Sequence, residues 1–110
     1  MTKTIVAALL GTLPTWAFAT SWVNVPLLDA TCAETAKVDP DGHPRDCLLQ
    51  CAGSGFGILD DGTWIPLDQV GDEKAVDALR ATTRKDHIRV NVTGEREGPL
   101  IHVTALTIAE

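Results

Sequence analysis

Three cysteines and one histidine are the residues of this sequence whose types and spacing could do chemistry. They are Cys32, His43, Cys47 and Cys51. If the segment after His43 is helical, His43, Cys47 and Cys51 follow one another one turn apart and line one helix face, at steps of about 6 Å. Cys32 could add a fourth side chain to this group. Thiolates and an imidazole suit zinc(II) or copper(I), so the spacing predicts a metal site with these four ligands.

A disulfide competes with the metal for the same thiols. Because the chain has three cysteines, one bridge would leave one thiol free, which also leaves a covalent dimer open. A bridge from Cys32 to Cys47 or to Cys51 would stabilise a small exported domain by roughly 2 to 4 kcal/mol, and such domains often carry one. A bridge between Cys47 and Cys51 is disfavoured, because their spacing on a helix fits disulfide geometry poorly.

Other chemistry finds no support in the sequence. The spacing of Cys47 and Cys51 matches neither the C-x-x-C of thioredoxin-like enzymes nor a haem attachment motif. A Ser-His-Asp triad would have to use Ser54 with His87 or His102, and nothing around Ser54 resembles a nucleophile elbow. The sequence therefore predicts no catalytic residue and no cofactor beyond the metal.

The first nineteen residues have the parts of a cleavable export signal. Lys3 is followed by an apolar stretch and then by Ala17, Phe18 and Ala19, which form an A-x-A end. We expect cleavage after Ala19. The apolar stretch is shorter than the roughly 20 residues of a membrane-spanning helix, so no membrane anchor is expected. The predicted location is the periplasm or the outside of the cell, where disulfides persist.

Length and charge limit what residues 20–110 could be. The chain of 110 residues is 45% hydrophobic and 22% charged, which predicts one packed domain over residues 20–110. Its formal net charge of -6 opposes binding to nucleic acid and to anionic membrane surfaces. The partners that remain are a protein or a small ligand.

Alternation of apolar and polar residues predicts five strands. The clearest covers residues 87–93, in which Ile88, Val90 and Val92 point to one face. In residues 100–108 the alternation slips after Ala105, which predicts a bulge. Pro26 likewise demands a bulge or an unpaired edge in the first strand. The other strands are expected at residues 22–29, 56–59 and 64–67, the last two joined by a tight turn.

Two helices complete the pattern. The longer one is expected at residues 72–84, with Asp72 as its cap and a narrow apolar stripe of Ala75, Val76 and Leu79. Such a stripe packs along one side only. A short helix at residues 44–51 begins at a proline and carries two of the cysteines.

The elements follow the order of a known fold. Three strands, a helix and two strands is the order of the oligonucleotide/oligosaccharide-binding (OB) fold, a five-stranded Greek-key barrel. The longer helix would cap this barrel, and the short Cys-bearing helix lies between the first two strands. Residues 88–94 and 101–103 resemble the closing strands of small exported bacterial OB-fold proteins, many without a known function. The cluster of His43, Cys47 and Cys51 ahead of the Gly-rich residues 53–57 also resembles a feature of uncharacterised exported proteins. This resemblance implies no established activity.

We therefore expect an exported, single-domain binding protein that catalyses nothing. The first hypothesis is metal binding, of copper or zinc, by Cys32, His43, Cys47 and Cys51. The second is an interaction module stapled by a disulfide, which binds a protein or a small envelope ligand on the face of the barrel. The metal hypothesis requires the fold to gather the thiols at one mouth of the barrel.

Overall fold

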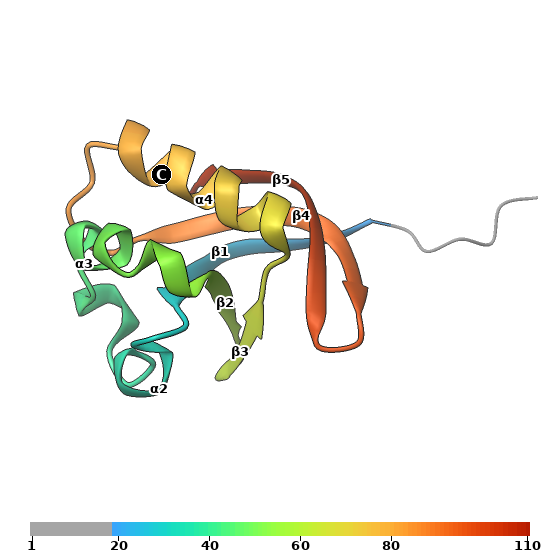
Figure 1. Ribbon diagram of the computed structural model, residues 1–110, viewed down its shortest axis with the longest axis horizontal. Coiled ribbons are helices and arrows are strands. Elements are labelled where there is room, and N and C mark those ends of the chain that lie inside the picture. The colour runs from blue at the N-terminus through green and yellow to red at the C-terminus, as the bar shows by residue number, and fades with distance from the viewer. Residues whose placement is uncertain (1–18) are drawn as a thin grey trace, which may run out of the picture.

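The computed structural model describes residues 19–110, which form a mainly β fold with five strands (Figure 1). The strands pair in one antiparallel sheet with the spatial order β3-β2-β1-β4-β5. This confirms the prediction of a mainly β fold with five strands. The predicted export signal lies outside the described residues, apart from Ala19. The strand bounds are β1 (Thr20–Asp29), β2 (Phe56–Asp60), β3 (Thr63–Pro66), β4 (Arg89–Glu97) and β5 (Leu100–Ile108).

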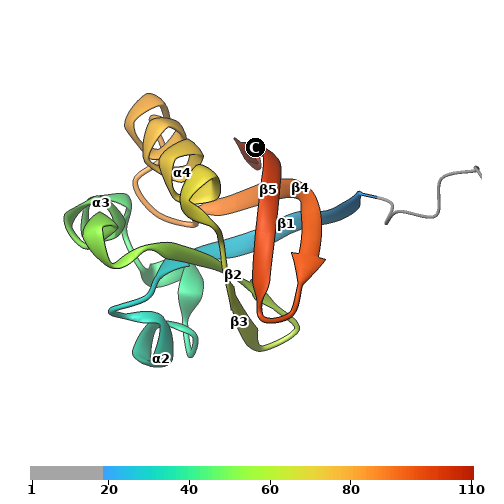
Figure 2. The same cartoon turned by 45° about the vertical axis from the view of Figure 1, so that its right-hand side comes forward.

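The sheet curls until its two edges approach each other (Figure 2). Leu67, directly after β3, forms a parallel bridge with Ile101 of β5, and the Asp68 N–H donates to the Ile101 carbonyl at 2.9 Å. The result is a half-barrel with the helices packed against it. Its buried core comprises Trp22, Leu27, Leu48, Phe56, Ile58, Ile65, Leu67, Ala75, Leu79, Ile88, Val90, Val92, Ile101 and Val103.

Two bulges help the sheet to bend. In β1 the pairing with β4 shifts between Trp22 and Val25, and Asn24 has a positive φ of 55°. The irregularity thus lies just before Pro26. In the β4–β5 pair the register shifts at Gly94, so that Thr104 is the extra residue, next to the predicted slip. An extra residue on one strand increases the local twist, which favours a curled sheet.

Gly94 is expected to be indispensable at this second bulge. A Cβ atom at this position would lie 2.3 Å from the His102 carbonyl oxygen. Replacing Gly94 with alanine should therefore destabilise the protein by about 1 to 3 kcal/mol in urea unfolding. Gly53→Ala is the matched control, because nothing lies within 4 Å of its added Cβ. Equal losses in the two variants would contradict this account of the bulge.

The longer helix, α4 (Gln69–Ala81), begins earlier than the sequence predicts. Asp68 is its cap and accepts the Gly71 N–H at 2.9 Å, so the prediction of Asp72 as the cap is wrong. The helix packs through Gly71, Ala75 and Leu79, a row that starts one turn before the predicted stripe. Gly71 permits close packing, since a Cβ there would lie 2.6 Å from the Val103 side chain. Gly71 is therefore a packing residue of α4.

The segment between β1 and β2 carries the candidate site residues. It contains α2 (Ala33–Ala36), the 3-10 turn η1 (Pro40–Gly42), α3 (Arg45–Gln50) and a second 3-10 turn, η2 (Ala52–Ser54). The sequence predicted a short helix at residues 44–51, which corresponds to α3, and no helix before it. Figure 1 shows α2 and α3 together at the end of β1, away from the tip of the β4–β5 hairpin. Within residues 19–110, no helix is long and apolar enough to span a membrane.

Candidate functional site

A buried aspartate, Asp29, is the centre of the candidate site. It is the last residue of β1, pairs with Phe56 of β2, and its side chain is fully buried. One carboxylate oxygen accepts the Cys32 N–H at 3.0 Å, and the other lies 2.8 Å from His43 Nε2. Because an ionised carboxylate can only accept, His43 donates to it. A buried carboxylate needs such partners, and here they are two residues predicted to form the site.

Cys32 and Cys51 meet at this carboxylate. Cys32 caps the start of α2, and Cys51 caps the end of α3. Their two sulfur atoms and one oxygen of Asp29 all lie within 4.8 Å of one another. The fold thus brings two predicted ligands together, and it adds a third group, Asp29, that the sequence analysis did not select.

Backbone contacts hold the two cysteine segments side by side. The Ala30 N–H donates to the Gly55 carbonyl at 2.9 Å, and the Thr31 N–H donates to Ser54 Oγ at 3.3 Å. Ser54 Oγ in turn donates to the Cys51 carbonyl at 2.8 Å. Gly55 has a φ of 88°, a conformation that glycine adopts without strain. The Gly-rich stretch therefore supplies the tight backbone that turns from Cys51 into β2.

His43 does not share a helix face with the cysteines. It has an extended backbone, with φ of -83° and ψ of 111°, and α3 begins only at Arg45 after Pro44 as the cap. The helical row of His43, Cys47 and Cys51 predicted from the spacing is therefore wrong. The imidazole reaches the site by another route, through its bond to the buried carboxylate.

An ion pair fixes the loop that carries His43. Arg89 of β4 donates to both oxygens of Asp41 in η1, at 2.9 and 3.2 Å. The His87 N–H also donates to the Asp41 carbonyl at 2.9 Å. The guanidinium beside Asp41 lowers the pKa of this carboxyl below its ordinary value. β4 and the loop before it thereby fix η1, which directly precedes His43.

Cys47 lies one helical turn before Cys51. The Cys51 N–H donates to its carbonyl at 3.1 Å, and its side chain is partly buried. Its sulfur is not part of the group formed by Asp29, Cys32 and Cys51. All three cysteines are free thiols in the structure. Of the two predicted disulfide partners of Cys32, Cys51 is therefore the one whose sulfur shares this group with the Cys32 sulfur.

The surroundings of Cys32 keep its thiol protonated. Burial is the largest cause that raises its pKa above the ordinary value, followed by the negative charge of Asp29 and by Cys51. Since the thiolate is the ligand form, a metal ion that binds here must displace this proton. Cys32 is therefore not a free, reactive thiolate in this environment.

Known proteins give no guide to this site. No family model, no curated protein and no solved structure matched the chain. The resemblance to exported OB-fold proteins stays a prediction from the sequence.

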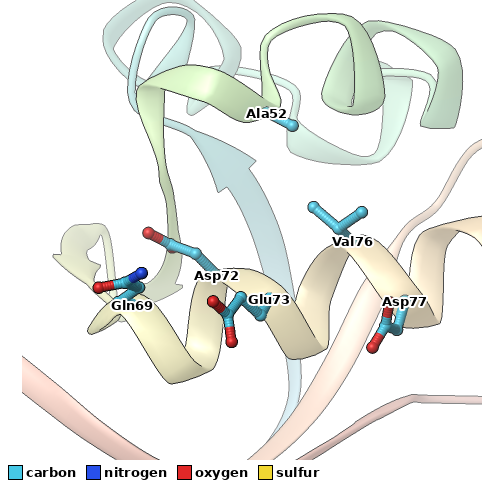
Figure 3. Close-up of a pocket in the computed structure, with 6 residues that line it drawn as sticks. All are labelled: Ala52, Gln69, Asp72, Glu73, Val76 and Asp77. Atoms are coloured by element: carbon cyan, nitrogen blue, oxygen red, sulfur yellow. The ribbon is translucent and has the colours of Figure 1, made fainter.

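A shallow groove of about 320 Å³ lies beside the site, between η2 and α4. Figure 3 shows Val76 of α4 facing Ala52, the residue after Cys51. Burial raises the pKa of Asp72, which accepts the Phe56 N–H at 2.9 Å and so ties α4 to β2. The other lining residues are Gln69, Glu73 and Asp77. Glu73 and Asp77 are exposed, and the groove holds none of the sulfur ligands.

His102 forms a second histidine–carboxylate cluster, at the start of β5. Its imidazole bonds to Glu97 on one side and approaches Asp68, the cap of α4, at 3.4 Å on the other. The hydrogen bond to Glu97 is the main cause that raises the pKa of His102, with partial burial opposing it. His102 thus links the β4–β5 hairpin to the helix by charge.

This cluster predicts a pH dependence of stability. A raised pKa in the folded state means that the folded protein favours the protonated imidazole of His102. The contribution of His102 to folding stability is therefore complete below the ordinary pKa of about 6.5, and it is lost as the pH rises through the raised pKa. The gap in urea midpoint between the wild type and His102→Gln should therefore be wider at about pH 5.5 than at about pH 8.5. A gap that is constant with pH would contradict the linkage.

Proposed function

We propose that this protein binds one thiophilic metal ion, zinc(II) or copper(I), between Cys32 and Cys51, with Asp29 as an oxygen donor. The observation that carries the proposal is the approach of two sulfurs and a carboxylate oxygen to within 4.8 Å of one another. Two metal–sulfur bonds of about 2.3 Å each span at most about 4.6 Å, so sulfurs up to 4.8 Å apart must move slightly closer to share one ion. Small side-chain rotations would complete the site.

The donor chemistry suits both metals in different ways. Thiolates select zinc and copper(I) over harder ions, and two thiolate ligands are enough to bind copper(I). The carboxylate oxygen suits zinc, which binds Asp together with Cys and completes a tetrahedron with a fourth ligand. Two thiolates and a carboxylate also carry enough negative charge to neutralise a divalent ion in a buried site.

His43 acts through Asp29 in this proposal. Its Nε2–H bond to the carboxylate, at 2.8 Å, orients the oxygen donor as outer-shell partners of metal ligands do. Cys47, one turn away, stays a predicted ligand with no part in the observed group. The proposal therefore assigns the sulfur donors to Cys32 and Cys51 and gives His43 an orienting role.

We further propose that the curled sheet is an OB-type barrel. The chain order of three strands, α4 and two strands supports it, and so does the parallel bridge between Leu67 and Ile101 that joins the two sheet edges. The metal-binding residues would then lie on the long connection between the first two strands. The export of the protein to the periplasm or beyond is proposed from residues 1–19 alone.

Metal titration of the reduced protein tests the proposal. Anaerobic protein is titrated with zinc chloride, and separately with copper(I) held by a competing chelator, while native mass spectrometry counts the bound ions. One ion per chain is expected for the wild type. Cys32→Ser and Cys51→Ser should each weaken binding by more than about a hundredfold, and His43→Ala by about 10- to 100-fold.

Cys47→Ser is the matched control in this titration, because it removes a thiol of the same segment outside the group. Its affinity should match that of the wild type. If the wild type binds neither metal, or if Cys51→Ser binds as tightly as Cys47→Ser, the proposal is wrong.

The second candidate function is a disulfide-stapled interaction module that binds a protein or a small envelope ligand. The closeness of Cys32 and Cys51 favours it too, since the same two sulfurs could form the staple. Protein isolated from the oxidising compartment with one blocked thiol pair, one free thiol and no stoichiometric metal would favour this module.

A further inference from the structure

We propose that Cys32 and Cys51 form a reversible disulfide that closes the metal site, and that Cys47 remains the free third thiol. The loss of metal on closure rests on the proposed function, whereas the choice of the bridged pair rests on geometry alone. The carrying observation is that two sulfurs from opposite ends of a long loop lie within 4.8 Å of each other as free thiols.

The backbone segments around this pair are tied together by hydrogen bonds. A disulfide needs a sulfur separation of about 2.05 Å and Cα atoms about 4.4 to 6.8 Å apart. The bonds from Ala30 to Gly55 and from Thr31 to Ser54 hold the two segments next to each other. The proposal requires rotation about the Cα–Cβ bonds of Cys32 and Cys51 to close the remaining gap between the sulfurs.

The position of Cys47 disfavours it as the disulfide partner of Cys51 or of Cys32. It lies one helical turn from Cys51, with the helix hydrogen bond between them at 3.1 Å, and this arrangement fits a disulfide poorly. Its sulfur is also outside the group that contains Cys32. Among the three pairs that three cysteines allow, the geometry points to one, and the odd number of thiols is explained.

The bond is made by thiol–disulfide exchange with a small-molecule disulfide, such as oxidised glutathione. One cysteine thiolate attacks a sulfur of this oxidant and releases one small thiol, and the second cysteine attacks the mixed disulfide and releases the other. The S–S bond of the oxidant breaks and that of the protein forms. The two electrons and two protons lost by Cys32 and Cys51 leave on the two small thiols.

Closure removes the ligands of the proposed metal site. The metal-binding form of cysteine is the thiolate, and a disulfide has none. Oxidation should release the metal, and reduction should restore its binding. A bound ion should in turn slow the oxidation, because both sulfurs are then occupied. The redox state of one sulfur pair would thus control whether the protein holds metal.

Intact-mass measurement tests the choice of pair. Reduced wild type, Cys47→Ser and Cys51→Ser are equilibrated with graded ratios of oxidised to reduced glutathione and then alkylated. The wild type should lose two hydrogen masses and keep one thiol that can be alkylated. Cys47→Ser should also lose two hydrogen masses but keep no such thiol. Cys51→Ser should form no internal bridge and only accept glutathione.

Two outcomes overturn the choice of pair: no closure in the wild type at any ratio, or closure that needs Cys47. Circular dichroism of each variant verifies folding, and Cys32→Ser provides a second variant that must also fail to close. These results involve no metal, so they are independent of the proposed function.

Zinc titration of the oxidised and the re-reduced protein tests whether the Cys32–Cys51 disulfide controls metal binding. The oxidised form should bind at least tenfold more weakly, and removal of the bridge should restore the affinity. Equal affinity in both forms overturns the redox control. If the bridge forms but the reduced protein binds neither metal, the proposed function fails and the redox control fails with it, while the pairing of Cys32 with Cys51 stands.

Discussion

Replacing Asp29 with alanine is expected to lower the free energy of unfolding by about 3 kcal/mol. The substitution leaves the Cys32 N–H and the His43 Nε2–H without the acceptor that now lies 3.0 and 2.8 Å from them. It also empties space at a fully buried position at the end of β1. Guanidinium unfolding followed by tryptophan fluorescence measures the loss.

Asp46→Ala is the matched control for this substitution. Asp46 belongs to the same segment, but 83% of its side chain is exposed and its only described bonds are to its neighbour Arg45. Its removal should change stability by no more than about 0.5 kcal/mol. If the two alanine variants unfold at the same denaturant concentration, Asp29 is not the centre of the site.

The substitution Asp29→Asn separates the effect of Asp29 on stability from its effect on metal binding. The amide keeps the shape of the side chain and one oxygen that can accept the Cys32 N–H, so the loss of stability should be smaller than for alanine. The amide is, however, a weaker metal ligand than the carboxylate. A variant that is stable but binds zinc at least tenfold more weakly is the expected result.

The strands were the part of the fold that the sequence allowed us to predict well. Residues 100–108 alternate apart from one slip, and β5 covers this range. Residues 56–59 and 64–67 match β2 and β3 to within one residue at each end. The start of α4 was missed because Gly71 weakens a helix as a local signal. In the structure Gly71 lets α4 approach Val103 closely, which is a tertiary contact.

The route of His43 into the site could have been found in the sequence. A proline disfavours the helical conformation in the residue before it, so Pro44 argues against a helical His43. A helical row of His43, Cys47 and Cys51 conflicts with this restriction. The structure has His43 extended, and the predicted helix face is lost for that reason.

Asp29 could not be assigned its role from the sequence. As a polar residue at the end of an apolar strand, it has the local signature of a strand terminus. Only the fold buries it and brings His43 to it across fourteen positions of the chain. Its one local mark is the Cys three residues later, whose N–H an aspartate at this spacing commonly accepts.

Closure of the Cys32–Cys51 bridge is expected to raise the stability of the protein by about 3 kcal/mol. The bridge closes the loop of residues 32–51, and in the chain-entropy model it removes freedom from the unfolded chain. For a domain of this size the gain corresponds to a rise in Tm of roughly 10 to 20 °C. Calorimetry of the reduced and the glutathione-oxidised protein, both free of metal, measures the difference.

The sign of this shift is informative, because strain in the folded state would reverse it. The contacts that hold the two segments together exist before oxidation, so little native geometry has to change when the bond forms. Cys47→Ser should show the same rise on oxidation, and Cys51→Ser should show none. A lower Tm in the oxidised wild type would mean that the two thiols are close but badly oriented. The pair would then serve better as metal ligands than as a bridge, since a metal ion accepts a wider range of sulfur directions than a second sulfur does.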